Sequence, residues 1–80
     1  MTDRYTGRRL VVSKDGRSGP YLTVPAMQIS DVQRVLDQSG IRYWVDETAI
    51  SLDGKPAMSV VNFGKSMSPA TIQSVLDRAG

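Results

Sequence analysis

Few side chains in this sequence are suited to covalent chemistry. The 80 residues include no histidine and no cysteine, so the commonest general base and any thiol nucleophile are missing. The adjacent carboxylates Asp46 and Glu47 fall in a turn predicted at residues 46–48, where such pairs are typical of a solvated loop tip. We therefore expect a protein that is not an enzyme, with no catalytic residue, no metal site and no cofactor.

A short run suited to anion binding follows a predicted strand and precedes a predicted helix. It consists of Gly64, Lys65 and Ser66, the order in which a phosphate-binding P-loop ends. A P-loop also needs a glycine five residues before Gly64, where this sequence has Ser59. The run is therefore not a P-loop, although weak anion binding stays open because a helix N-terminus attracts negative charge.

Positive charge is concentrated at the start of the chain. Residues 1–17 carry five basic and two acidic side chains, a net charge of +3, whereas the remainder has a net charge of −1. Residues 1–7 are predicted to be a flexible basic arm, and Arg4, Arg8 and Arg9 are its candidate contacts for nucleic acid. A solvated N-terminus without a ligand explains the same charges, and we favour it because cations and anions are mixed.

Aromatic side chains offer another kind of contact. Tyr21, Tyr43 and Trp44 are the candidate residues for binding a protein partner. Tyr43 and Trp44 are neighbours in a predicted strand, so they must point to opposite faces of a sheet. One large aromatic is then expected on the face away from the helices, where it would mark an interaction surface. The alternative is that Trp44 is simply the largest side chain of the core.

Two stretches of the sequence are near-copies of each other. Residues 32–40 recur as residues 72–80, and each copy is preceded by an Asp-Gly turn, at Asp15-Gly16 and at Asp53-Gly54. Such turns are strong hairpin signals because both residue types tolerate positive φ. The repetition predicts two related units packed in one pseudo-symmetric domain.

Both copies place apolar side chains at the spacing of one helix face. In the first helix Ser30 is the predicted N-cap, Gln33 completes a capping box, and Gly40 ends the helix. In the second helix Ser68 is the N-cap and Pro69 the first helical residue. The two stripes are Val32, Val35, Leu36 and Ser39, and Ile72, Val75, Leu76 and Ala79.

Asp37 and Asp77 occupy equivalent positions near the two helix C-termini, where the helix dipole disfavours negative charge. We expect each carboxylate to pair with a nearby base, for example Arg34 for Asp37.

The predicted strands cover residues 8–13, 21–25, 41–45, 49–52 and 58–63, and alternation directs Leu22, Val24, Val61 and Phe63 inward. The order is ββα followed by βββα. We predict an α+β, pseudo-duplicated two-layer sandwich with both helices on one face of a mainly antiparallel sheet. Residues 8–80 form a single domain, with halves at 8–40 and 41–80.

The segment Gly40-Ile41-Arg42-Tyr43-Trp44-Val45, which follows a helix, resembles small ferredoxin-like and ACT-like bacterial regulatory modules over residues 20–64. The predicted order departs from their βαββαβ order because it begins with a hairpin and ends on a helix. We assign no family on this resemblance.

The apolar runs are far shorter than the roughly 20 residues that span a bilayer, the N-terminus lacks the apolar run of a signal peptide, and no cysteine is present to form a disulfide. We therefore expect a cytoplasmic protein without a membrane partner.

Three functions remain open. The leading hypothesis is a non-catalytic interaction or adaptor module that self-associates as a homodimer and presents a sheet face or edge to a protein partner. The second is a regulatory domain that senses a small ligand or anion where the halves meet. The third is nucleic-acid binding through the basic arm and exposed aromatics. Because the body of the chain has a net charge of −1, we do not expect nucleic acid to be the main partner.

Overall fold

The structure is a computed structural model that describes residues 1–14, 19–50, 57–65 and 67–79. For residues 47–50 it describes the backbone alone. Every structural statement below concerns these residues.

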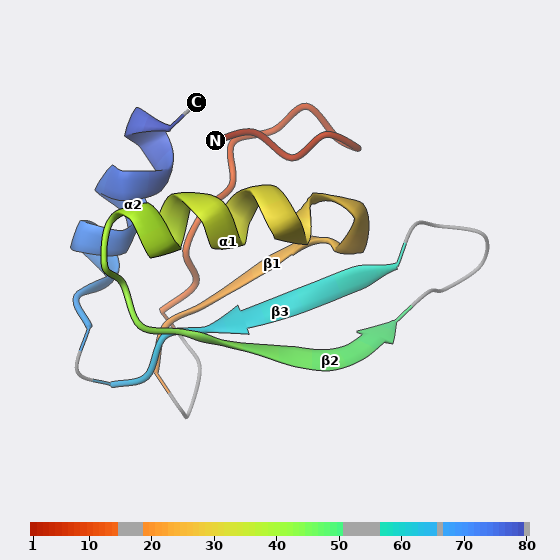
Figure 1. Cartoon of the computed structure of the whole chain (residues 1–80). Helices are drawn as coiled ribbons and strands as arrows, with labels where there is room; N and C mark the ends of the chain where they lie inside the picture. Colours follow the sequence, from red (N-terminus) through yellow and green to blue (C-terminus); the bar gives the residue numbers. More distant parts are fainter. Residues whose placement is uncertain (15–18, 51–56, 66, 80) are drawn as a thin grey trace.

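Within the described residues the chain forms three strands and two α-helices (Figure 1). In chain order they are β1 (Tyr21–Pro25), α1 (Ile29–Gln38), β2 (Trp44–Ile50), β3 (Met58–Asn62) and α2 (Pro69–Arg78). A 3₁₀ turn at Ala26–Gln28 joins β1 to α1. The strands form one antiparallel sheet in the order β1-β3-β2. The predicted α+β class is therefore confirmed.

The hairpin predicted in the second half of the chain is present, because β2 pairs with β3 in antiparallel register. Its predicted turn at Asp53-Gly54 lies outside the described residues. On the inner face, Val61 of β3 aligns with Leu22 of β1 and Val45 of β2. Strand β3 therefore joins the two outer strands of the sheet.

One hydrophobic core holds the sheet and the helices together. The inward-facing strand residues are buried as predicted: Leu22, Val24, Val61 and Phe63. They pack in one cluster with the helix-stripe residues Val32, Leu36, Ile72, Val75 and Leu76, of which Leu36 and Leu76 are both fully buried. Ser39 and Ala79, the last residues of the predicted stripes, are exposed. Figure 1 shows both helices and residues 1–12 on the same side of the sheet. No helix of the described residues covers the other sheet face.

The prediction of a strand at residues 8–13 is wrong. This stretch forms only isolated bridges, between Arg9 and Thr2 and between Ser13 and Tyr21. Its side chains at Leu10 and Val12 are nevertheless buried in the core. The stretch is extended and apolar on one side, as a strand would be, but its backbone bonds are divided among Met1, Asp3, Tyr21 of β1 and the Gln73 side chain of α2.

The turn predicted at residues 46–48 is also wrong. The described parts of the predicted strands 41–45 and 49–52 share one element, because β2 runs from Trp44 to Ile50. Its register with β3 shifts between Asp46 and Ile50, which includes the position of the predicted turn. The exposed Asp46 lies on the face of an edge strand that is open to water. A carboxylate there stays hydrated, so it does not have to end the strand.

The helix ends agree with the predictions in part. Helix α1 begins at Ile29, before the predicted cap Ser30, and its N-cap residue is the buried Gln28. The Gln28 side chain accepts from the amide of Arg4 and donates to the carbonyl of Thr2. The predicted capping box is therefore absent, because the 3₁₀ turn leads directly into α1 and places Ser30 inside the helix.

The other predicted end signals are confirmed. Ser68 is the N-cap residue of α2 and Pro69 is its first residue, although the Ser68 side chain makes no capping hydrogen bond. Gly40 closes α1 with a positive φ of 69°, which lets the amide of Ile41 donate to the carbonyl of Leu36 at 3.0 Å.

The element order β-α-β-β-α equals the βαββαβ pattern up to its last strand, because the predicted opening hairpin is reduced to a bridge. Among the described residues, neither helix has the length or the apolar content required to cross a membrane.

Candidate functional site

The outer face of the sheet, which carries no helix, presents Trp44. This side chain is 53% exposed, unlike the buried residues of the inner face. Asn62 lies between Trp44 and Tyr21 in one cross-strand row, and Val60 lies between Asp46 and Thr23 in the next row. We call these six residues the outer sheet face. As predicted, one of the two adjacent aromatics points away from the helices.

Trp44 rests against the glycine that was predicted to bind anions. A Cβ atom placed on Gly64 would lie 3.6 Å from Cζ3 of the Trp44 ring, and Gly64 has a φ of 77°. A Cβ atom on Gly19 would lie 2.6 Å from the carbonyl carbon and oxygen of Gly64. The backbones of Gly19 and Gly64 therefore approach so closely that a side chain on Gly19 would not fit. At Gly64 the space beside the indole ring would admit a Cβ atom, and it is the positive φ that favours glycine there.

The rest of the predicted anion site is only partly described. Lys65 follows Gly64 and is exposed, whereas Ser66 lies outside the described residues. The structure thus places the candidate partner residue Trp44 beside Gly64, although the sequence had separated them by twenty positions.

Tyr43 does not belong to the outer sheet face. Its hydroxyl donates a hydrogen bond to Oδ1 of Asp37 near the end of α1, at 2.9 Å. Burial raises the pKa of the Tyr43 phenol, and the hydrogen bond from its hydroxyl to Asp37 raises it further. Of the three candidate aromatics, Tyr21 and Trp44 share a face, while Tyr43 serves the helix side.

Two of the three candidate arginines form ion pairs within the chain. Arg4 pairs with Asp31, and Arg9 pairs with Asp77. The side chain of Arg8 is exposed. Arg4 and Arg9 thus pair with different helices, α1 and α2, and contact of the three arginines with nucleic acid stays a prediction.

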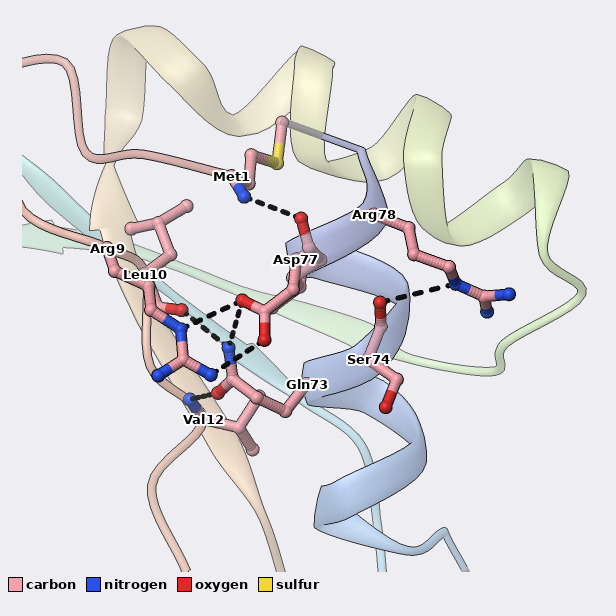
Figure 2. Close-up of polar contacts among 9 residues, drawn as sticks. Met1, Arg9, Leu10, Val12, Gln73, Ser74, Asp77 and Arg78 are labelled. Carbon is pink, nitrogen blue, oxygen red and sulfur yellow. Dashed lines mark hydrogen bonds and ion pairs between the residues drawn. The ribbon is translucent and has the colours of Figure 1, made fainter.

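Residues 1–12, which we call the N-terminal segment, lie on the helix side of the sheet in Figure 1. Thr2 and Arg4 bond Gln28 and Asp31 near the start of α1. Figure 2 shows the contacts of Met1 and residues 9–12 with α2, and Gln73 is at their centre. The amide of Val12 donates to Oε1 of Gln73 at 2.8 Å, and Nε2 of Gln73 donates to the carbonyl of Leu10 at 2.9 Å. One side chain therefore satisfies two backbone groups of the segment. The flexibility predicted for residues 1–7 concerns motion in solution and stays a prediction.

Asp77 completes this cluster. Its carboxylate accepts two hydrogen bonds from the Arg9 guanidinium, at 2.7 and 2.9 Å, and a third from Nε2 of Gln73 at 3.0 Å. The hydrogen bonds from Arg9 and then Gln73 are the main reasons that the pKa of Asp77 falls to about 2. The carboxylate is therefore ionised at any physiological pH.

Sequence reasoning missed Gln73 as a contact residue. It expected a base near Asp77 but did not identify Arg9, which lies 68 residues away along the chain. The recurrence of Gln and Asp in both helices was the available signal, but it does not say which surface those residues face.

A shallow groove of about 330 Å³ lies where the C-terminal ends of the helices meet. It is lined by three pairs of positions that are forty residues apart in the sequence: Val35 and Val75, Gln38 and Arg78, and Ser39 and Ala79. Its lining is thus apolar at the valines and polar at Gln38, Ser39 and Arg78. This groove is the region in which the second functional hypothesis placed a ligand.

Among the described residues, no group of three or more Asp or Glu side chains is arranged to hold a metal ion. Comparison with known protein families, with curated proteins and with solved structures found no match for this chain.

Proposed function

We propose that the protein is a small non-catalytic interaction module that presents its outer sheet face to a protein partner, with a second copy of the chain as the first partner to test. The observation that carries this proposal is Trp44, a large side chain that is 53% exposed. Tryptophan is enriched among the residues that dominate binding energy at protein interfaces. A domain of 80 residues also gains stability when such a face is covered.

The surroundings of Trp44 support the same proposal. The ring lies beside Gly64, whose lack of a side chain leaves the indole accessible to a partner on that side. The strand that carries it, β2, is an edge strand of the sheet. An edge strand can add a partner strand through its backbone, which extends the interface beyond the aromatic row.

Nucleic-acid binding is the less favoured alternative. Arg4 and Arg9 already neutralise Asp31 and Asp77 within the chain. A phosphate-binding surface needs several cations that are not engaged in this way.

Sedimentation velocity over a concentration series tests the main proposal. Wild-type protein should self-associate, or bind a partner isolated with it, and Trp44→Ala should weaken that association at least about tenfold. Met27→Ala is the matched control, because Met27 is 71% exposed but lies in the 3₁₀ turn on the helix side. A strict monomer that instead binds oligonucleotides with steep salt dependence would overturn the proposal.

The finer fold description belongs to the same proposal. We take the domain to be a two-layer sandwich of two halves related by duplication, with the helix pair 32–38 and 72–78 as the equivalent elements. The three equivalent pairs that line the groove support this relation. An experimental structure in which one rotation fails to superpose β1-α1 on β3-α2 would contradict it. A cytoplasmic location is likewise proposed, and cell fractionation tests it.

The groove supports a second candidate function, the sensing of a small ligand. Its volume of about 330 Å³ falls at the lower end of the range found for ligand pockets. Screening small organic acids and amines by chemical shift perturbation at Val35 and Val75 tests it. A screen that leaves both valines unshifted would remove this candidate.

A further inference from the structure

We propose that α2 carries a recognition site for an extended Arg-Leu-x-Val segment, and that two copies of the chain can exchange the N-terminal segments that fill it. In the structure the chain's own residues 9–12 occupy the site. The exchange uses none of the residues of the outer sheet face, so it stands apart from the proposed function above.

The site recognises backbone first. Gln73 bonds the carbonyl of Leu10 and the amide of Val12, two groups that point the same way along an extended chain (Figure 2). A neighbouring strand would bond the same two groups. A glutamine side chain therefore takes the place of a strand and fixes the position of the segment along α2.

Side-chain recognition follows the alternation of an extended chain. Leu10 and Val12 are 3% and 4% exposed and belong to the core, whereas Val11 between them is 58% exposed. The site thus accepts apolar side chains at the positions of Leu10 and Val12 and does not select the side chain at the position between them. This pattern defines the Leu-x-Val part of the recognised sequence.

The negative charge of Asp77 selects the residue that precedes the Leu-x-Val pattern, which is Arg9 in this chain. The Arg9 guanidinium binds the Asp77 carboxylate through two hydrogen bonds, a geometry that lysine cannot reproduce. Gln73 also donates to Asp77 and so holds the carboxylate in place. The neighbouring Arg8 is exposed, and its side chain forms no ion pair among the described residues. Arg9 is therefore the specific residue, and Arg8 provides a matched control.

The mode of attachment makes exchange feasible. The N-terminal segment forms only isolated bridges and belongs to no strand of the sheet. Met1 and residues 9–12 of the segment bond α2, and Thr2 and Arg4 bond Gln28 and Asp31 near the start of α1. An identical segment of a second copy offers identical contacts. Exchange then preserves each of these interactions and changes only which copy supplies them, the low-cost route to dimers known as domain swapping.

Charge reversal provides the test with full-length chains. Arg9→Asp and Asp77→Arg each place like charges together when the segment binds its own copy or an identical copy. In an equimolar mixture, exchange restores opposite charges at both sites. We expect native mass spectrometry and light scattering to show a 1:1 heterodimer at least about tenfold tighter than either homodimer. A mixture that shows no heterodimer would overturn the proposal.

Two controls isolate the segment. Arg8→Asp mixed with Asp77→Arg should form no such heterodimer, because Arg8 does not contact the site. Adding Trp44→Ala to both partners should leave the heterodimer intact, so failure of the outer sheet face and failure of the exchange are distinguishable. Loss of the heterodimer in the Trp44→Ala background would assign the association to the sheet instead.

A second measurement does not depend on charge reversal, in case Asp77→Arg fails to fold. The sequence has no cysteine, so Val11→Cys gives a single site for a spin label on the exposed side of the segment. Spin-labelled Val11→Cys protein at natural isotope abundance is mixed with ¹⁵N-labelled wild-type protein. Exchange predicts broadening of the α2 amides around Gln73 in the ¹⁵N copies. Intensities unchanged at millimolar concentration would refute it.

Discussion

The C-terminal ends of α1 and α2 carry the same sequence pattern, yet different parts of the chain complete them. In α1 the carbonyl of Leu36 accepts from the amide of Ile41, just beyond Gly40. In α2 the equivalent carbonyl of Leu76 accepts from the N-terminal ammonium group of Met1 at 2.5 Å. The first helix end is therefore closed locally, and the second by a segment distant in the sequence.

The two equivalent aspartates differ in the same way. Asp37 accepts from the hydroxyl of Tyr43, six residues further along the chain, whereas Asp77 accepts from Arg9. Arg34, the base expected for Asp37, pairs with Asp31 instead. The shared pattern thus specifies the buried stripe of each helix, but the surface partner depends on which segment happens to pack beside it.

The largest expected effect tests the part of the pattern that the helices share. Leu36→Ala and Leu76→Ala should each lower the free energy of unfolding by about 2–5 kcal/mol, because both side chains are fully buried. Chemical denaturation of the two variants provides the measurement. A loss below about 1 kcal/mol in either one would mean that the two stripes are not equivalent in the core.

The buried stripes were predictable because periodic apolar residues must find a core. Val32, Leu36, Ile72 and Leu76 reach it as the spacing indicated. The sequence indicated an extended stretch at residues 8–13, but it does not say which groups bond the backbone there. A neighbouring strand and the side chain of Gln73 can each supply such hydrogen bonds. The pairing of Arg9 with Asp77 depends on tertiary packing across 68 residues, which no local pattern records.

The sequence predicted individual residues of the candidate site but not how these residues are arranged. Strand alternation placed Tyr43 and Trp44 on opposite faces, but it did not say which one faced out. The proximity of Trp44 to Gly64 and the close approach of Gly19 to the Gly64 backbone both arise from tertiary packing, which strand alternation does not record. The turn at 46–48 was mispredicted because charged residues are equally compatible with a loop and with the hydrated face of an edge strand.

The next prediction compares the equivalent glutamines. Gln73→Ala removes two hydrogen bonds to the N-terminal segment and leaves the amide of the buried Val12 without its partner. We expect a loss of about 1–3 kcal/mol in the free energy of unfolding. Gln33→Ala should change it by less than about 0.5 kcal/mol, because the Gln33 side chain has no hydrogen bond among the described residues. Equal losses in the two variants would contradict the assigned role of Gln73.

The third prediction concerns acid stability. The pKa of Asp77 is lowered to about 2 from its usual value near 4, chiefly by the Arg9 hydrogen bonds. A lowered pKa means that the carboxylate stabilises the folded state above the unfolded value and that this contribution is lost as the pH falls from about 4 to about 2. Asp77→Asn should therefore flatten the pH dependence of the melting temperature in this window, whereas Asp37→Asn serves as the matched control. An unchanged slope in Asp77→Asn would show that the ion pair is absent in solution.

The smallest effect is expected at the locally closed end of α1. Burial raises the pKa of Tyr43 first, and its hydrogen bond to Asp37 adds to the rise. A raised pKa means that this contribution is present below the unfolded value near 10 and is lost at higher pH, as the phenol ionises. Tyr43→Phe should cost less than about 1 kcal/mol because water competes for an exposed hydrogen bond.

Titration of the tyrosine ring signals by NMR separates the two causes, with Tyr43→Phe identifying the resonance. Asp37→Asn should move the pKa of Tyr43 back toward its usual value without reaching it, because burial is the larger cause and is unaffected by the substitution. A complete return to the usual value would make the hydrogen bond the dominant cause. Asp77→Asn should leave the Tyr43 titration unchanged, because the two equivalent aspartates have separate partners. A coupled response would show that the two helix ends, despite their different partners, are linked through the core.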